Sequence, residues 1–310
     1  MLRSLDKVLL FACCAFGIIG ELKAQQIQMN TPFITVRSVV NPAYLGELEL
    51  DQIDFFMGTK QKWQNVPGAP QVDVLQLNKK WTERNSVGFN FVRHSFATYK
   101  YNSFNIPYCF DAKINDVSTL RLGLTTRFIN SNIDFTESIT ENPNEPAVGN
   151  YRPNTWFLDA TAGFAFFYKT RVKFGGAINN FVVNGSINGS DLLDYNNYSV
   201  FQGLFDCSVN MVEKDKLTVS ADYIRYITRI TPAISEFYIR SRFDIEELRL
   251  TVGVGYKSTS DFVTLTKLNY KGNYLIVTTQ MNNSDNQLGY FSGNFFGIGM
   301  TLDPVERKQK

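Results

Sequence analysis

Hydrophobic and polar residues alternate along many short segments of this chain. In residues 120–128, for example, Leu120, Leu122 and Leu124 fall on one face of an extended chain, whereas Arg121 and Arg127 fall on the other. The same alternation recurs in residues 156–166, 203–211, 217–223 and 248–256. A period of two residues is the signature of a β-strand with one apolar face. The pattern therefore predicts an all-β protein.

The alternation predicts about fourteen strands, with boundaries that are uncertain by a few residues. They cover residues 49–60, 70–81, 86–97, 98–110, 117–128, 154–168, 170–183, 199–213, 215–225, 233–243, 245–256, 260–270, 272–281 and 288–301. The alternation slips between Val74 and Leu75, which indicates a β-bulge. Pro107 cannot donate a hydrogen bond to a neighbouring strand, which indicates a bulge or a position at the rim of the sheet.

The connections between these strands alternate in length. Short connections lie at residues 82–85, 114–116, 169–170, 213–214, 244 and 271–272, and longer ones at 61–69, 130–154, 184–198, 226–232 and 282–287. Transmembrane barrels combine short periplasmic turns with long extracellular loops. The pattern therefore favours a transmembrane up-and-down antiparallel β-barrel of about fourteen strands, surrounded by the lipid of a Gram-negative outer membrane. A secreted β-sandwich remains the alternative.

The beginning of the chain has the composition of an export signal. Arg3 and Lys7 precede or flank a short apolar stretch, and Ala24 offers a small residue for cleavage. The apolar stretch is short for a membrane-spanning helix, so residues 1–24 are predicted to be an N-terminal signal peptide. A lipoprotein signal that ends at Cys13 is the alternative.

Composition narrows the range of functions. The 310 residues carry a net charge of +2 and are 44% hydrophobic. This is typical of a folded protein and gives no support to nucleic-acid binding. Two cysteines follow the predicted signal peptide, Cys109 and Cys207. Their positions within the alternating segments place them on opposite faces, so a disulfide between them is not expected.

Motifs for catalysis or metal binding are missing from the sequence. The chain has one histidine, His94, which excludes a multi-histidine metal site and which we assign to the lumen or rim of the barrel. Glu137, Glu141 and Glu145 lie in the longest predicted connection, where a solvated surface loop is the simplest interpretation. We therefore expect no enzymatic activity, no cofactor and no metal.

A series of short motifs follows the predicted signal peptide. Its residues are Asn41, Pro42, Ala43, Tyr44 and Gly46, then Trp63, then Gly68, Ala69 and Pro70. In order and spacing the motifs resemble the PorP/SprF family of outer-membrane proteins, which is associated with type IX secretion and gliding in Bacteroidetes. Lys62 stands where that family has Gln, and the charged tail after Leu302 departs from the family's usual ending.

The first motif has the chemistry of a turn. Pro42 fixes its own backbone and favours an extended Asn41, whose side chain can close an Asx-type turn. Tyr44 is then expected to anchor the chain at the periplasmic rim. The segment 68–70 is expected to lead from an extracellular loop into the second strand. We interpret the motifs as architectural, with a partner-binding role as the alternative.

The resemblance implies a non-enzymatic component of type IX secretion. Such a protein aids the secretion or surface attachment of a cargo, for example an adhesin, through the cargo's C-terminal sorting domain, and it contacts periplasmic secretion components. Candidate cargo-contact residues in the long loops are Glu137, Glu141, Glu145, Tyr195 and Tyr198. An outer-membrane diffusion channel or small-solute transporter is the alternative. Its lumen would be lined or filled by inward residues such as Arg121, Arg127, Asp206 and Asp222.

The expected organisation has four parts. Residues 1–24 form the signal peptide, 25–47 a periplasmic N-terminal segment, 48–302 the barrel and 303–310 a charged C-terminal tail.

Overall fold

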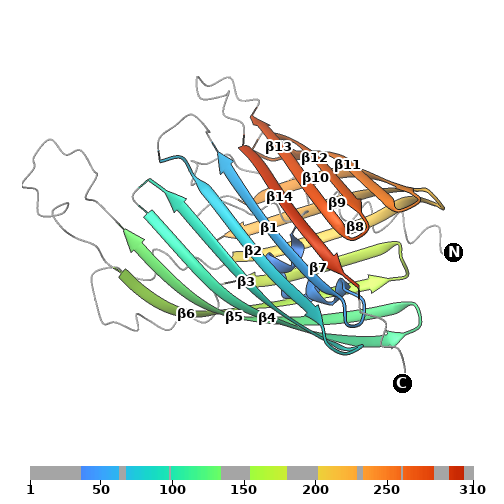
Figure 1. Ribbon diagram of the computed structural model, residues 1–310, viewed down its shortest axis with the longest axis horizontal. Helices are drawn as coiled ribbons and strands as arrows, with labels where there is room; N and C mark the ends of the chain where they lie inside the picture. The colour runs from blue at the N-terminus through green and yellow to red at the C-terminus, as the bar shows by residue number, and fades with distance from the viewer. Residues whose placement is uncertain are drawn as a thin grey trace, which may run out of the picture.

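Fourteen antiparallel strands form one closed barrel in the described part of the chain (Figure 1). The structure, a computed structural model, describes residues 36–62, 68–97, 99–133, 154–179, 202–228, 233–259, 261–282 and 293–303. The strands are β1 (Ile53–Lys62), β2 (Gln71–Lys80), β3 (Asn85–Phe96), β4 (Tyr99–Asn115), β5 (Ser118–Ile133), β6 (Asn154–Tyr168), β7 (Val172–Asn179), β8 (Gln202–Lys214), β9 (Leu217–Thr228), β10 (Ile234–Ile245), β11 (Leu248–Lys257), β12 (Asp261–Tyr270), β13 (Asn273–Asn282) and β14 (Gly293–Leu302). Each predicted segment overlaps one of them, so the prediction of a fourteen-strand barrel is confirmed.

The barrel closes where its first and last strands meet. Every strand pairs with its neighbours in sequence, and β1 pairs with β14 in an unbroken register from Ile53 opposite Leu302 to Lys62 opposite Gly293. Closure leaves no sheet edge, which lipid requires because it offers no partner to unpaired backbone groups. The connections that follow the even-numbered strands are short and lie at one end of the barrel, here called the short-turn end. In transmembrane barrels this end faces the periplasm, and the opposite, long-loop end faces outward.

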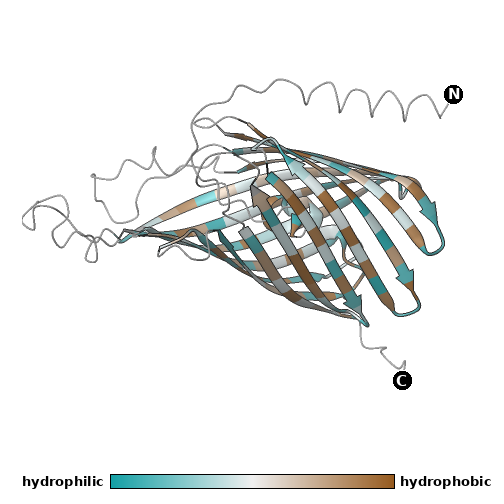
Figure 2. Ribbon diagram, turned by 90° about the horizontal axis from the view of Figure 1, so that it is seen from above, coloured by the Kyte–Doolittle hydropathy of each residue, from teal (hydrophilic) through white to brown (hydrophobic). Residues whose placement is uncertain are grey.

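The two faces of each strand differ in chemistry. Leu122, Leu124 and Phe128 point outward from β5 and are 48%, 50% and 43% exposed. From the same strand, Arg121 and Arg127 point inward, where each forms an ion pair with an interior aspartate. Figure 2 shows the alternation of hydrophobic and hydrophilic positions along the strands. An apolar outer face is what contact with lipid requires.

The prediction of a β-bulge between Val74 and Leu75 is wrong. Strand β2 keeps a single register with both β1 and β3 through these residues. The alternation slips because Val72 and Val74 point inward yet are apolar, since they join a hydrophobic cluster inside the barrel. Apolar residues therefore occupy both faces of this part of β2.

Pro107 also lies in a regular part of the sheet. It pairs in register with Thr125 of β5, and its missing donor interrupts only the ladder toward β3. The register shifts instead between Lys113 and Asn115 and between Asn210 and Val212. Both shifts lie close to short turns, where strand pairing ends.

Some predictions fall outside the described residues. These include the signal peptide, the tail beyond residue 303 and most of the long loops. Within the described ranges, no helix is both long enough and apolar enough to cross a membrane.

Leu124→Arg should destabilise the barrel in lipid. Leu124 lies midway along β5 and points outward, and a lipid-facing arginine near the bilayer midplane costs about 2–4 kcal/mol. Unfolding by denaturant of the protein reconstituted in lipid vesicles measures the effect, with Leu124→Phe as the apolar control. Equal stability of the two variants would contradict the assignment of this face to lipid.

Candidate functional site

A short segment before the first strand lies inside the barrel. Residues 36–47, here called the plug, form helix α2 (Arg37–Val40) and the 3₁₀-helix η1 (Pro42–Glu47). Figure 1 shows these turns enclosed by the strands, and η1 packs chiefly against β4, β5 and β6. Ala43 is 0% and Tyr44 is 3% exposed. The described part of the segment expected to be periplasmic, 25–47, is therefore located in the lumen.

The conformation of the plug follows from the Asn-Pro sequence. Asn41 is extended, as a residue before proline prefers, and Pro42 begins η1, where no donor is lost. The side-chain oxygen of Asn41 accepts a hydrogen bond from the Ala43 amide at 3.1 Å. Its side-chain amide donates to the carbonyls of Phe164 and Gly176, at 3.1 and 3.3 Å. The predicted Asx-type turn is thus present, and its cap is also bonded to the barrel wall.

The wall lacks side chains where the plug approaches it most closely. Gly123 of β5 and Gly163 of β6 are paired in register and face the plug. A Cβ atom at Gly123 would overlap the backbone of Pro42 and Ala43, and one at Gly163 would overlap the side chain of Asn41. The plug therefore fits only because both positions are glycine.

Tyr44 lies in the interior and not at the rim where it was expected. Its hydroxyl donates a hydrogen bond to Asp206 of β8, and its ring meets Phe167 edge-on at 6.1 Å. Arg37 lies over the same ring, 5.3 Å from its centre. Burial and the neighbouring carboxylate of Asp206 raise the pKa of Tyr44 well above its usual value. Tyr44 therefore remains a neutral hydrogen-bond donor.

Charged and polar groups tie the plug to opposite sides of the wall. Arg37 pairs with Asp222 of β9 at 2.8 Å, and Ser38 bonds to Gln76 of β2. At the far end of the plug, Glu47 pairs with Lys173 of β7 at 2.7 Å. These contacts reach three separated strands, so the plug bridges the lumen.

A further plug contact involves a buried cluster of side chains on β2 and β4. Lys80 donates to the carbonyl of Gly46 at 3.1 Å and pairs with Asp111 at 2.8 Å. Cys109 lies beside them with its thiol directed at the carbonyl of Ala43. Cys109 therefore lies on the inner face of β4.

Hydrophobic and paired polar side chains fill the interior beyond the plug. Phe56 stacks between Tyr274 and Phe295, with ring centres 6.1 and 6.0 Å apart. Toward the long-loop end, Glu236 pairs with Lys257 at 2.6 Å. His94, which was assigned to the lumen or rim, faces the lumen and lines a small cavity of about 110 Å³.

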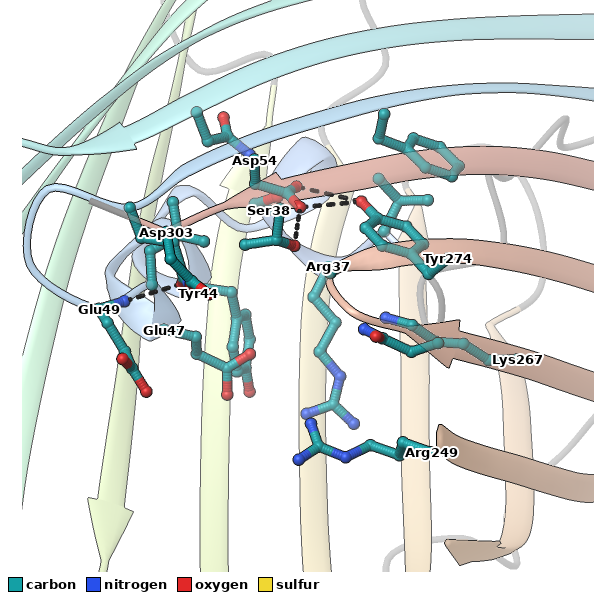
Figure 3. Close-up of a pocket in the computed structure, with 18 of the residues that line it drawn as sticks. Arg37, Ser38, Tyr44, Glu47, Glu49, Asp54, Arg249, Lys267, Tyr274 and Asp303 are labelled. Atoms are coloured by element: carbon teal, nitrogen blue, oxygen red, sulfur yellow. Dashed lines mark hydrogen bonds between the residues drawn. The ribbon is translucent and has the colours of Figure 1, made fainter. Parts of the chain in front are cut away.

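A larger space opens at the short-turn end, and we call it the vestibule. It has two lobes, of about 930 and 730 Å³, which share Glu47, Lys173 and Arg240 in their linings. The large lobe is lined by the plug and by β1, β2, β7 and β10–β14, and the small lobe by Glu47 and by β5–β11. In the large lobe, Arg37, Arg249 and Lys267 extend from different elements toward the same space (Figure 3).

The structure separates the motifs that the sequence placed in one series. Asn41, Pro42, Ala43, Tyr44 and Gly46 all lie in the plug. Gly68 adopts a left-handed φ of 70° in the connection after β1 and accepts a hydrogen bond from Ala97, at the long-loop end. Ala69 and Pro70 follow it directly into β2, as expected.

Other candidate residues lie outside the described ranges. They are Trp63, Glu137, Glu141, Glu145, Tyr195 and Tyr198. Within those ranges, no cluster of three or more potential metal ligands is found. Sequence reasoning assigned Asp206 and Asp222 to the lumen correctly but missed that they hold the plug. No local sequence pattern marks this role, because the contacts join residues more than a hundred positions apart.

Comparisons with known proteins agree with this architecture. The family model described as "Type IX secretion system membrane protein PorP/SprF" matches residues 22–302. No curated protein matches the chain. A solved Pseudomonas aeruginosa FadL homologue is similar with a TM-score of 0.51 at 12% identity, covering 85% of this chain and 92% of that one. The Ralstonia pickettii toluene transporter TbuX gives a TM-score of 0.50 at 11% identity, with the same coverage. At such identities the likeness shows the fold alone.

Gly123→Ala should loosen the plug. The added methyl group would overlap backbone atoms of Pro42 and Ala43, which cannot turn aside as a side chain can. We expect deuterium uptake by residues 36–47 to rise at least tenfold, equivalent to about 1.4 kcal/mol of lost protection. Gly293→Ala is the control, because the nearest atom to a Cβ added there is Cγ of Lys62 at 3.3 Å and no plug residue is close. Unchanged uptake in Gly123→Ala would contradict the tight fit.

Glu47 should make plug docking sensitive to acid. Burial alone would raise the pKa of Glu47, but Lys173 and Arg37 lower it from 4.5 to about 2. A lowered pKa means that the carboxylate stabilises the fold above about pH 4.5 and stops doing so as the pH falls toward 2. The effect should be modest, because the side chain is 36% exposed.

Thermal unfolding of the detergent-solubilised barrel across this pH window provides the measurement. The melting temperature of the unaltered protein should fall more steeply than that of Glu47→Gln. Glu49→Gln, which removes a nearby exposed carboxylate, should follow the unaltered protein. Parallel curves for all three proteins would exclude this role of Glu47.

Proposed function

This chain belongs to the PorP/SprF family of type IX secretion system membrane proteins, and on that premise we propose that it helps one specific cargo protein to reach or remain on the cell surface. The protein acts without enzymatic chemistry, as a β-barrel of the outer membrane. Its partners are the C-terminal sorting domain of the cargo, for example of an adhesin, and periplasmic secretion components.

The observation that carries this proposal is the occupied lumen. The plug crosses the barrel and is bonded to strands on opposite sides. An interior filled by its own chain favours a role as a docking body over a role as a passage for solutes. The two ends remain available for partners, with the vestibule on the periplasmic side and the long loops on the outer side.

We place cargo contact in the long loops at the outer end. The candidate residues there remain Glu137, Glu141, Glu145, Tyr195 and Tyr198. Tyrosines are suited to anchor a protein interface, and acidic residues are suited to its polar rim. Loop exchange between this chain and a barrel of the same family that serves another cargo would test the assignment.

A diffusion channel or small-solute transporter is the second candidate. The fold is shared with a toluene transporter, and the vestibule already forms a wide opening at one end. For this function the plug would have to leave its position. Conductance across planar lipid bilayers by the purified barrel, and its increase in Gly123→Ala, would favour the channel.

Deletion of the gene in its own host should remove one exported protein from the cell surface, and the tagged barrel should restore it. Affinity purification from detergent-solubilised outer membranes, followed by mass spectrometry, should recover that cargo or periplasmic secretion components. The control is the same tag on an unrelated outer-membrane barrel. Normal surface proteins after deletion, together with a barrel that purifies alone and conducts ions, would replace this proposal with the channel.

A further inference from the structure

Several cations on the wall around the plug share a carboxylate with a second cation. Three aspartates each serve two cations. Asp111 pairs with Lys80 at 2.8 Å and with Arg121 at 3.2 Å. One carboxylate neutralises only one cation, so this pair of contacts leaves a positive surplus.

The same arrangement occurs twice more. Asp222 receives Arg37 at 2.8 Å and Arg240 at 2.6 Å. Asp244 receives Arg242 at 3.0 Å and Arg249 at 2.6 Å. The surplus cations line the vestibule, where an anion could approach them from the short-turn end.

The small lobe is the part of the vestibule best suited to an anion. Its lining includes six cationic side chains and three carboxylates, and the cations are Arg121, Lys169, Lys173, Lys214, Arg240 and Arg242. The large lobe differs, because carboxylates such as Glu49, Glu246 and Glu247 line it. These acidic groups would repel an acidic ligand at that side.

Arg121 shows that the small lobe has unused donors. Its guanidinium lies 4.2 Å from the centre of the Phe167 ring, and the carboxylate that it contacts, Asp111, is shared with Lys80. Nε of Arg121 makes the contact with Asp111, whereas Nη1 is buried without a hydrogen bond in the described structure. Buried donors of this kind are costly to leave unsatisfied.

Neutral donors surround these cations. Ser208, Asn210, Thr218, Ser220 and Thr251 line the same lobe. Hydroxyl and amide groups can bond both to carboxylates and to peptide backbone. The lobe measures about 730 Å³, within the usual size of ligand sites. Its cations are spread over four strands and one turn, which suits several carboxylates along a chain better than one compact anion.

We propose that the small lobe binds an extended, acidic stretch of a partner polypeptide that enters from the periplasmic side. The identification of the ligand as polypeptide rests on the proposed function, and its acidic character rests on the charges of the lobe. The side chains that would meet its carboxylates are Arg121, Arg242 and Lys214. Lys169, in the turn after β6, and Lys214, the last residue of β8, lie where the ligand would enter.

The test uses the purified full-length mature barrel in detergent and fluorescence anisotropy. The probe is a labelled, C-terminally amidated peptide of repeated Asp-Gly-Ser units, and the matched probe replaces Asp with Asn. We expect binding of the acidic probe only, and weaker binding as salt increases from about 0.1 M to 1 M.

Charge removal should locate the site. Arg242→Gln combined with Lys214→Gln should weaken binding of the acidic probe at least tenfold, whereas Arg242→Lys should retain it. The control combines Lys113→Gln, near the end of β4, with Lys216→Gln, in the turn after β8, and removes the same charge from positions outside the lining of the lobe. Heat-modifiable migration on gels checks that each variant is folded.

Several outcomes would overturn the proposal. These are no binding of the acidic probe, equal binding of the two probes, or equal weakening by the control variant. Full displacement of the probe by low concentrations of inorganic phosphate would show a site for small anions and would also overturn it.

Failure of this inference can be distinguished from failure of the proposed function. If gene deletion removes the cargo from the surface but the Arg242/Lys214 variant restores it fully, the proposed function stands and the inference falls. If deletion leaves the surface proteins unchanged, the proposed function is contradicted, whether or not the acidic peptide binds the barrel.

Discussion

The close approach of the Asn41–Ala43 backbone to the barrel wall is the contact on which the interior depends. Two glycines paired across β5 and β6 leave the space for it, and the amide of Asn41 then reaches carbonyls of β6 and β7. Once this turn is in place, Tyr44 meets Asp206 and Arg37 meets Asp222. Without it, those interior aspartates would face the lumen with fewer partners.

Carboxylates that are shared by two cations explain how so many charged side chains can be buried in one barrel. A carboxylate between two guanidinium or ammonium groups stays ionised and remains well bonded, although it leaves positive charge over. The plug adds to this arrangement as both an acid and a base, because Glu47 pairs with Lys173 and Arg37 with Asp222. The plug is therefore part of the electrostatic structure of the wall as well as a body that fills space.

The strands could be predicted from the sequence because lipid dictates their outer face. Leu122 and Leu124 reveal that face through a local period of two. The same rule failed at Val74, because the inner face of β2 is also apolar there and the alternation no longer distinguishes inside from outside. Local pattern therefore predicts a barrel strand well only where its lumen side is polar.

The position of the plug could not be predicted in the same way. Asn41 is bonded to residues more than a hundred positions away along the chain, and no local period marks such a contact. The turn itself was predictable from Asn-Pro, whereas its location was not. In the sequence, Gly123 and Gly163 are only small residues on the inward face, whereas in the structure Gly123 admits the backbone of Pro42 and Ala43 and Gly163 admits the side chain of Asn41.

The covalent connection between plug and barrel has a consequence for competition inside the lumen. Five residues, 48–52, join the end of η1 to the start of β1. A tether this short holds the plug near its site at an effective concentration in the millimolar range or higher. A free peptide that made the same contacts would compete with the plug only at a comparable concentration. The plug therefore disfavours binding of a diffusing ligand at its own position. Partners are left with the space beside the plug, because the short tether makes the plug the favoured occupant of its own position.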